Sequence, residues 1–376
     1  MNELEKALEA RRQVLDGCRS IVVKAGTRLL TDVWLIPKLI AGIAQLRSKG
    51  YQVLLVSSGA VGIGMQQLHM TRRPRALSEV QALAAIGQEK LMSRYDAACQ
   101  EYGFKSAQLL LTAADLRSRE RHLNVLNCIN ALWKYDILPI VNENDSVSVD
   151  ELKFGDNDIL SGMLAIMTGA QLTIILTTES GLRKRNADGS LGERISVVRA
   201  ISEEMRADAA GTDNATLSIG GMISKLRAAA MVTATGQSLW VADGRAENVL
   251  SDIAAGKDIG TLFLPNHGRL QARKRFIRFF AKSSGRLTVD AGAATAIVEG
   301  GKSLLPSGVI ASEGKFRRGD TLDICNAEGV LLGRGLSNFS SEECEQIMGR
   351  HGSEISHLLG RDADVEMIHR DNFCLA

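Results

Sequence analysis

The sequence has few aromatic residues, no paired cysteines and no long apolar run. Only 4% of its 376 residues are Phe, Trp or Tyr. The six cysteines are scattered without a CxxC pair, which argues against a zinc site and against a disulfide framework. No apolar stretch reaches the length of about 20 residues that a membrane span requires. These absences favour reduced thiols, no protein-held metal centre, no membrane association and a cytoplasmic location.

The chain also lacks a strong net charge. Its 45 basic and 43 acidic side chains give a formal charge of +2, so there is no overall attraction to nucleic acid or anionic membranes. A hydrophobic content of 45% is ordinary for a globular protein, and 376 residues suffice for two domains with their own cores. The first 17 residues mix acidic, basic and apolar side chains, which predicts a short amphipathic helix and not a signal peptide.

Short apolar runs alternate with segments of helical periodicity over the first two-thirds of the chain. We expect strands at 21–23, 53–56, 108–111, 137–141, 172–176 and 239–241, and helices at 36–49, 79–102, 119–135 and 221–235. The pattern Ser78-x-x-Gln81 predicts a capping box in one of these helices. This alternation predicts an open, mostly parallel sheet sandwiched by helices, an α/β fold.

Polar residues and glycines follow five of the expected strands. Lys24, Ser58, Thr112, the segment 142–145 and Thr177 each stand at or just after a strand end. In open parallel sheets, ligands bind outside the carboxyl ends of the strands. The sequence therefore predicts a binding site at this edge.

A second region of different character begins near Pro265. Glycine turns separate short strands expected at 285–290, 308–310, 319–324 and 329–333, with little helix between them. This spacing is typical of a small β-barrel. We expect an N-terminal helical extension over 1–18, an α/β domain over 19–268 and the second domain over 274–376.

Lysines beside glycine-rich turns indicate phosphoryl transfer without a P-loop. Neither GxxxxGK[ST] nor a GxGxxG after a strand occurs. Instead, Lys24, the glycine turn at 57–65 and GGMISK at 220–225 offer N–H donors and positive charge. The acidic and amide-rich stretch 142–158 can be read as part of this site or as an Asx-rich loop that caps its own backbone.

Six segments carry a resemblance to a known family. VVKAGT, SSGA, NENDSV, FGDND, LTTESGL and GGMISK resemble, in order and spacing, the amino acid kinase family over about residues 19–265. The chain looks most like the members that phosphorylate the side-chain carboxylate of L-glutamate with ATP and Mg²⁺. That reaction yields γ-glutamyl phosphate and begins proline biosynthesis.

The resemblance implies roles for individual residues. The catalytic residues would be Lys24, Lys225 and Asp158, with the aspartate holding both lysines. The glutamate-binding residues would be Ser58, Asp145, Asn157 and Asn142. The nucleotide-binding residues would be Lys24, Thr177, Thr178, Ile219, Gly220, Gly221, Met222 and Lys225.

Departures from the family pattern all fall on the nucleotide side. Arg28 stands where relatives usually carry Ser or Thr, Thr178 replaces an aspartate, Arg183 replaces a tyrosine, and Ser218-Ile219 replaces Gly-Thr. One interpretation is a shifted nucleotide affinity or preference, with Arg28 contacting phosphate. The other is neutral drift at a loop rim.

The second region, from about 274 to 370, resembles a PUA domain, a module that binds RNA in other proteins. A basic patch would comprise Arg273, Lys274, Arg275, Arg278, Arg317 and Arg318. Scarce aromatics leave few platforms on which bases could stack, so RNA binding is not expected.

Rival interpretations keep the fold but change the function. Acetylglutamate, aspartate, carbamate or UMP could be the acceptor, although NEND, GDND and the C-terminal barrel together disfavour them. Alternatively, the chain could be a regulatory or RNA-binding protein on a decayed kinase scaffold. The resemblance further implies a homodimer or homotetramer, feedback inhibition by proline and transfer of the product to a γ-glutamyl phosphate reductase.

Overall fold

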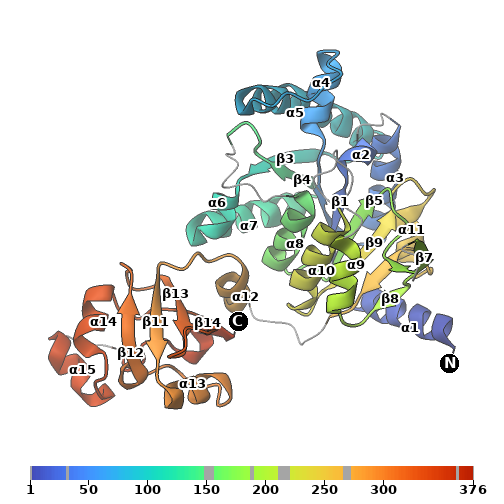
Figure 1. The fold of residues 1–376 in the computed structure, drawn as a ribbon. Helices are drawn as coiled ribbons and strands as arrows, with labels where there is room; N and C mark the ends of the chain where they lie inside the picture. Colours follow the sequence, from blue (N-terminus) through green and yellow to red (C-terminus); the bar gives the residue numbers. More distant parts are fainter. Residues whose placement is uncertain are drawn as a thin grey trace. The chain divides into compact units, whose positions relative to one another are not determined.

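The computed structural model describes residues 2–30, 34–147, 156–186, 190–210, 221–265, 272–360 and 364–375. The chain divides into two compact units, one of residues 1–116 and 120–269 and the other of residues 117–119 and 270–376 (Figure 1). Among the described residues, no helix is both long and apolar enough to cross a bilayer.

An eight-stranded sheet forms the centre of the first unit. All six expected strands are present, as β1 (Ser20–Ala25), β2 (Gln52–Val56), β3 (Ser106–Leu111), β4 (Leu138–Glu143), β5 (Leu172–Thr177) and β9 (Ser238–Asp243). The strand order is β3-β4-β2-β1-β5-β9-β10-β8, with β10 (Thr261–Phe263) and β8 (Val197–Val198) added at one edge. Only the β9–β10 pair in this sheet is antiparallel, so the expected mostly parallel sheet is confirmed.

Helices cover both faces of this sheet (Figure 1). Their bounds are α1 (Glu3–Asp16), α2 (Thr27–Leu30), α3 (Leu35–Ser48), α4 (Ala60–Gln67), α5 (Leu77–Gln100), α6 (Ala113–Arg117), α7 (Arg119–Lys134), α8 (Asn157–Thr168), α9 (Glu203–Ala210), α10 (Met222–Thr233) and α11 (Val249–Ala254). The four expected helices correspond to α3, α5, α7 and α10. The predicted capping box is wrong, because α5 begins at Leu77, before Ser78, and its N-cap, Ala76, has no side chain that could cap the helix.

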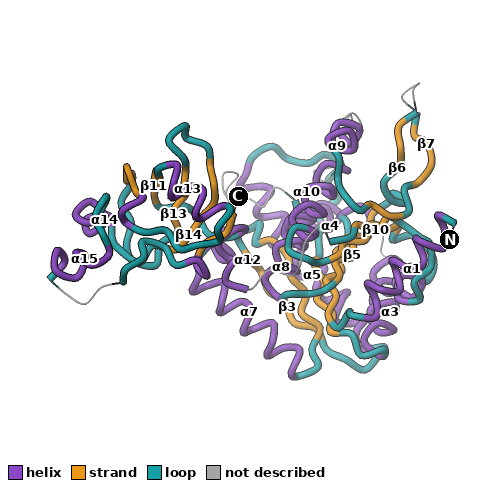
Figure 2. The backbone as a smooth tube through the Cα atoms, turned by 90° about the horizontal axis from the view of Figure 1, so that it is seen from below, coloured by secondary structure: helices purple, strands orange, loops and turns teal. Residues whose placement is uncertain are grey.

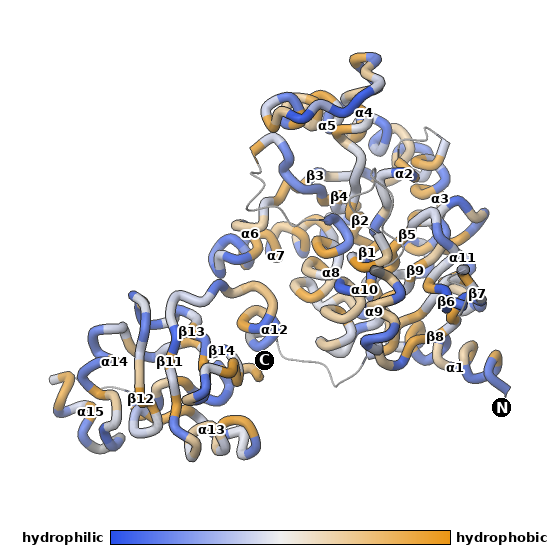
Figure 3. The backbone as a smooth tube through the Cα atoms, viewed as in Figure 1, coloured by the Kyte–Doolittle hydropathy of each residue, from blue (hydrophilic) through white to orange (hydrophobic). Residues whose placement is uncertain are grey.

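The central strands are apolar because both faces of the sheet are covered. All six residues of β1 are buried, and Figure 3 shows the hydrophobic end of the colour scale around β1 and β5. A parallel sheet between two helix layers needs this continuous burial. A lysine inside such a strand, Lys24, is therefore unusual and requires a partner.

Two glycines let α4 and α5 pack with their backbones in close approach. A Cβ atom on Gly64 would lie 2.0 Å from the carbonyl oxygen of Leu83, and one on Gly87 would lie 1.8 Å from that of Ala60. Neither position accepts a side chain without displacing a helix. The two helices thus form a tight hairpin, which fixes the segment that connects them.

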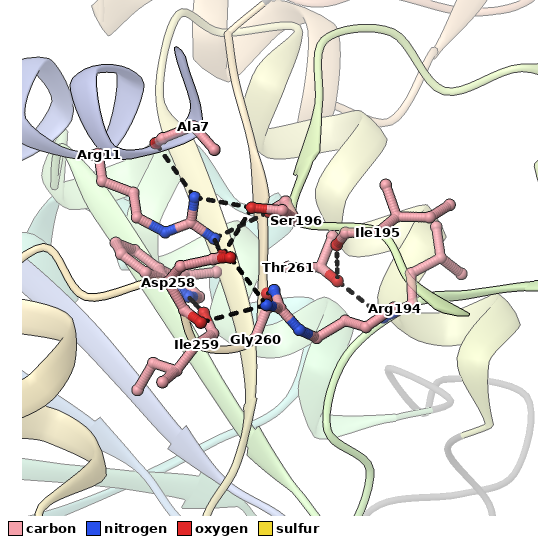
Figure 4. Close-up of polar contacts among 11 residues, drawn as sticks. Ala7, Arg11, Arg194, Ile195, Ser196, Asp258, Ile259, Gly260 and Thr261 are labelled. Carbon is pink, nitrogen blue, oxygen red and sulfur yellow. Dashed lines mark hydrogen bonds and ion pairs between the residues drawn. The ribbon is translucent and has the colours of Figure 1, made fainter. Parts of the chain in front are cut away.

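Helix α1 is joined to the sheet by a buried arginine (Figure 4). The Arg11 side chain is fully buried, and its guanidinium lies 2.8 Å from a carboxylate oxygen of Asp258 and donates to Ser196 Oγ at 3.0 Å. Asp258 also pairs with Arg194 at 3.1 Å and accepts from Ser196 at 2.6 Å. We call Arg11, Arg194, Ser196 and Asp258 the Asp258 cluster. It fixes α1 against the segment that follows β7.

The strands β6 (Arg183–Arg185) and β7 (Leu191–Arg194) form an antiparallel hairpin. Figure 2 shows it projecting from the body of the first unit. The base of the hairpin is tied to β10, because Thr261 Oγ1 accepts from the amide of Leu182 at 2.8 Å and donates to the carbonyl of Ile195 at 2.6 Å.

The second unit contains one five-stranded sheet of mixed direction. Its strands are β11 (Gly285–Val289), β12 (Val309–Glu313), β13 (Thr321–Cys325), β14 (Leu331–Leu336) and β15 (Phe373–Leu375), in the order β12-β11-β13-β14-β15. Helices α12 (Ala272–Phe279), α13 (Ala291–Val298), α14 (Ser341–Ile347) and α15 (Gly352–Leu359) accompany them, with 3₁₀ turns η2 (Pro306–Gly308) and η3 (Arg370–Asn372).

The expectation of little helix in this unit is wrong. Asp290 caps α13 by accepting a hydrogen bond from the amide of Ala293 at 2.7 Å, and the helix that follows is rich in alanine, the strongest helix former. The glycines on either side hid this cap in the sequence.

Candidate active site

One cavity of about 620 Å³ lies at the carboxyl ends of β1, β2, β4 and β5. Its size is that of a small-molecule site. It is lined by ten of the predicted site residues, namely Lys24, Ser58, Asn142, Asp145, Asn157, Thr177, Thr178, Gly221, Met222 and Lys225. Ile219 and Gly220, and the departure at Ser218, lie outside the described residues.

Two lysines from different elements converge on one buried aspartate. Lys24 Nζ of β1 lies 2.5 Å from Asp158 Oδ1, and Lys225 Nζ of α10 lies 3.0 Å from Asp158 Oδ2. Asp158 is 0% exposed and each lysine is 5% exposed. Burial by itself would raise the pKa of Asp158, but the charges and hydrogen bonds of the two lysines outweigh burial and lower it. The aspartate is therefore ionised and holds both ammonium groups at one end of the cavity.

A second carboxylate, Asp156, stands beside this centre. It is the N-cap of α8, where its Oδ1 accepts from the amide of Asp158 at 3.0 Å, and it lies 4.0 Å from Lys24 Nζ. Burial and the negative charge of Asp158 raise the pKa of Asp156. The sequence pattern GDND drew attention to this residue without indicating a role for it. The available signal in the sequence was the position of Asp156 as the N-cap of α8.

A network of amides builds the wall that the resemblance assigns to glutamate. Asn157 Nδ2 donates to the Ser57 carbonyl at 2.6 Å, to Ser58 Oγ at 2.9 Å and to Asn142 Oδ1 at 2.9 Å. Asn142 in turn donates to Gln88 Oε1 at 2.9 Å. Sequence reasoning missed Gln88, because a single glutamine within α5 carries no signal of its own.

The opposite wall is made largely of backbone. Thr177 ends β5, Thr178 follows it, and Gly221 is the N-cap of α10, where it has no side chain to cap the first turn. The carbonyl of Thr178 accepts from Arg245 Nη2 at 2.6 Å. Free amides at a helix N-terminus are suited to bind phosphate.

Three of the departures from the family pattern line the cavity, namely Thr178, Arg28 and Arg183. Arg28 on α2 and Arg183 on β6 are exposed side chains that line it. Helix α2 adjoins the end of β5, since Gly26 donates its amide to the Leu176 carbonyl at 3.1 Å. Both arginines thus belong to the wall that carries Thr177 and Thr178.

Comparisons with known proteins show which families the chain resembles. The model of the amino acid kinase family matches residues 19–243, and that of the PUA domain matches residues 285–359. A "Glutamate 5-kinase" of Syntrophus aciditrophicus is 42% identical over 373 residues, covering 98% of this chain and 97% of the relative. A protein of the same description from Desulfotalea psychrophila is 42% identical over 375 residues, covering 98% and 100%.

Among solved structures, carbamate kinase from Giardia lamblia bound to AMP-PNP is similar to this chain. It shares 19% identity and a TM-score of 0.48 with this chain, and the match covers 66% of this chain and 99% of that protein.

Proposed function

The chain belongs to the amino acid kinase family, among its glutamate 5-kinases, and from this premise we propose that the cavity transfers phosphate from ATP to the side-chain carboxylate of L-glutamate. The product is γ-glutamyl phosphate, the first intermediate of proline biosynthesis. The observation that carries the proposal is the convergence of Lys24 and Lys225 on Asp158 in the same cavity as the amide network.

Charge compensation is what this reaction requires from the protein. The γ-carboxylate of glutamate has an ordinary pKa of about 4.3 and is already ionised at neutral pH, so no general base is needed. Its approach to ATP brings together negative charges, which repel by about 4 kcal/mol per pair of unit charges at 4 Å and an effective dielectric of 20. Lys24 and Lys225 offset this repulsion, and Asp158 keeps both ammonium groups aimed at the transferred phosphoryl group.

The remaining predicted residues bind and orient the two substrates. Ser58, Asn142, Asp145 and Asn157 contact glutamate, with the carboxylate of Asp145 facing its ammonium group. Thr177, Thr178, Gly221 and Met222, together with Ile219 and Gly220, hold the nucleotide. The rigid amide network supports this assignment, because a site that is fixed before binding loses less entropy when the substrate enters.

Mg²⁺ accompanies ATP in this proposal and offsets charge on the phosphates. Among the described residues, no group of three acidic, histidine or cysteine side chains could cage a metal. Mg²⁺ is usually held mainly by phosphate oxygens and water. Asp156 fits as a protein contribution, since it lines the cavity and its carboxylate lies 4.0 Å from Lys24 Nζ.

A hydroxylamine trap tests the proposal on the purified protein. With glutamate, ATP and Mg²⁺, the wild type should yield γ-glutamyl hydroxamate, and omission of glutamate should abolish it. Absence of hydroxamate with ATP, GTP and CTP alike would contradict the proposal. Acetylglutamate, aspartate and carbamate serve as competing acceptors in the same series, and UMP, whose product is not an acyl phosphate, is tested by the release of ADP.

Several expectations from the sequence stay predictions. These are the cytoplasmic location, a homodimer or homotetramer, inhibition by proline and delivery of the product to a γ-glutamyl phosphate reductase. The alternative of a regulatory or RNA-binding protein on a decayed scaffold receives no support from the comparisons, since the relatives of similar length are described as glutamate 5-kinases.

A further inference from the structure

The acceptor carries a charge for which the residues predicted so far provide no cationic partner. Glutamate has a γ-carboxylate that reacts, an α-ammonium group and an α-carboxylate. The proposed function directs the γ-carboxylate to Lys24 and Lys225 and the ammonium to Asp145. Removing the α-carboxylate from water is costly unless a cation or several donors receive it.

Six cationic side chains line the cavity among the described residues: Lys24, Arg28, Arg73, Arg183, Arg185 and Lys225. The two lysines are paired with Asp158. We call Thr177, Thr178, Gly221 and Met222, the residues proposed to bind the nucleotide, the nucleotide wall. Arg28 lies on α2, and Arg183 and Arg185 lie on β6, the strand that follows Thr178 in the chain, so we group these arginines with that wall. Arg73 alone in this group comes from the segment between α4 and α5.

That segment joins two helices that adjoin residues of the predicted glutamate site. Helix α4 begins directly after Ser58 and Gly59, and α5 carries Gln88, which accepts the hydrogen bond from Asn142. Met65 of α4 and Val80 of α5 line the same cavity as Arg73. The close packing at Gly64 and Gly87 joins α4 to α5, and Arg73 lies in the connector between these two helices.

Arg73 is also available for a ligand. It is exposed, and within the described part of the chain it makes no ion pair or hydrogen bond with another residue. A guanidinium matches a carboxylate in a two-point hydrogen-bonded geometry. Its neighbour Arg72 is equally exposed but does not line the cavity.

We propose that Arg73 binds the α-carboxylate of the acceptor and so makes the site specific for an α-amino acid. The inference rests on the proposed function and adds a residue that binds the end of the substrate opposite the reacting γ-carboxylate. Arg73 would determine how tightly and in which orientation glutamate binds, while the chemistry stays with the two lysines and Asp158.

Steady-state kinetics of Arg73→Ala and Arg72→Ala test the proposal. Losing a charged hydrogen-bonding partner should raise the KM for glutamate by about 10- to 100-fold in Arg73→Ala, with kcat and the KM for ATP within about twofold of wild type. Arg72→Ala, the matched control, should change none of these constants by more than about twofold. Arg73→Lys should restore part of the lost affinity.

Two substrate analogues show which group Arg73 reads. 4-Aminobutyrate lacks only the α-carboxylate, so its kcat/KM should be the same in wild type and Arg73→Ala. Glutarate keeps both carboxylates and lacks the ammonium group, so its kcat/KM should fall as that of glutamate does. An unchanged glutamate KM in Arg73→Ala overturns the proposal, and so does an equal loss toward 4-aminobutyrate. Failure of the proposed function would look different, because the wild type would then form no γ-glutamyl hydroxamate.

Discussion

The two walls of the cavity are built in different ways. The wall proposed to bind glutamate, the glutamate wall, consists of buried and half-buried side chains that hydrogen-bond one another, with Asn142 2% exposed and linked to both Gln88 and Asn157. The nucleotide wall consists of strand ends, a bare helix N-terminus and exposed arginines such as Arg28 and Arg183. Side-chain identity is thus fixed on one wall and less constrained on the other.

This difference explains where the sequence departs from the family pattern. A backbone amide binds phosphate whichever side chain its residue carries, so substitutions such as Thr178 or Arg28 leave the donors in place. Changing one amide of the glutamate wall would leave its partners buried without hydrogen bonds. All the departures identified in the sequence lie on the nucleotide side.

The largest effect on kcat is expected from a substitution of Lys225. Lys225→Ala removes one of two charges that stabilise the transferred phosphoryl group, and kcat should fall by about 10²- to 10³-fold for every nucleotide. Hydroxamate formation under saturating substrates measures it. Lys134→Ala, an exposed lysine at the end of α7, is the control and should keep full activity. A fall of less than fivefold would remove Lys225 from the mechanism.

We expect the Asp258 cluster to affect the binding of ATP and not the binding of glutamate. Asp258→Asn leaves the fully buried Arg11 without its carboxylate, which should lower the free energy of unfolding by about 3 kcal/mol. Because the cluster and Thr261 hold the base of the β6–β7 hairpin, the KM for ATP should rise and that for glutamate should stay constant. Urea unfolding and steady-state kinetics together check this. Equal changes in both KM values would show a general loss of structure.

Asn142→Ala should break the glutamate wall selectively. The variant leaves Gln88 Oε1 without its donor and deprives Asn157 of an acceptor, so the KM for glutamate should rise by about 10-fold or more. The KM for ATP should change by less than about twofold. Gln88→Met tests the same link from the other end, and a normal glutamate KM in both variants would argue against the network as a binding element.

The smallest effect is expected from Arg28→Ser on the nucleotide wall. An exposed arginine near phosphates contributes about 0.2–1 kcal/mol, so the KM for ATP should rise by about fivefold at most, and less at high salt. Measuring ATP, GTP and CTP separates a general phosphate contact from a change in base preference. Identical constants for all three nucleotides in wild type and variant would favour neutral drift.

The sequence predicted much of this architecture and some of it wrongly. The six strands were readable because continuous apolar runs are required in a doubly covered parallel sheet. The capping box at Ser78 failed, since the helix begins before it, and α13 was missed because its alanines stood among glycines. Gln88 and Arg73 gave no local signal. Their relevance depends on how α5 lies against the sheet.

The sequence by itself determined which segments are strands and which edge of the sheet carries polar residues, because both follow from periodicity within a few positions. The contact of Lys225 with Asp158, 67 positions away, was implied by the resemblance and not by any local pattern, and only the tertiary structure decided that Arg11 reaches Ser196, 185 positions away. Such contacts depend on strand order and helix packing, which local patterns do not encode. The catalytic charge balance therefore belongs to the folded chain.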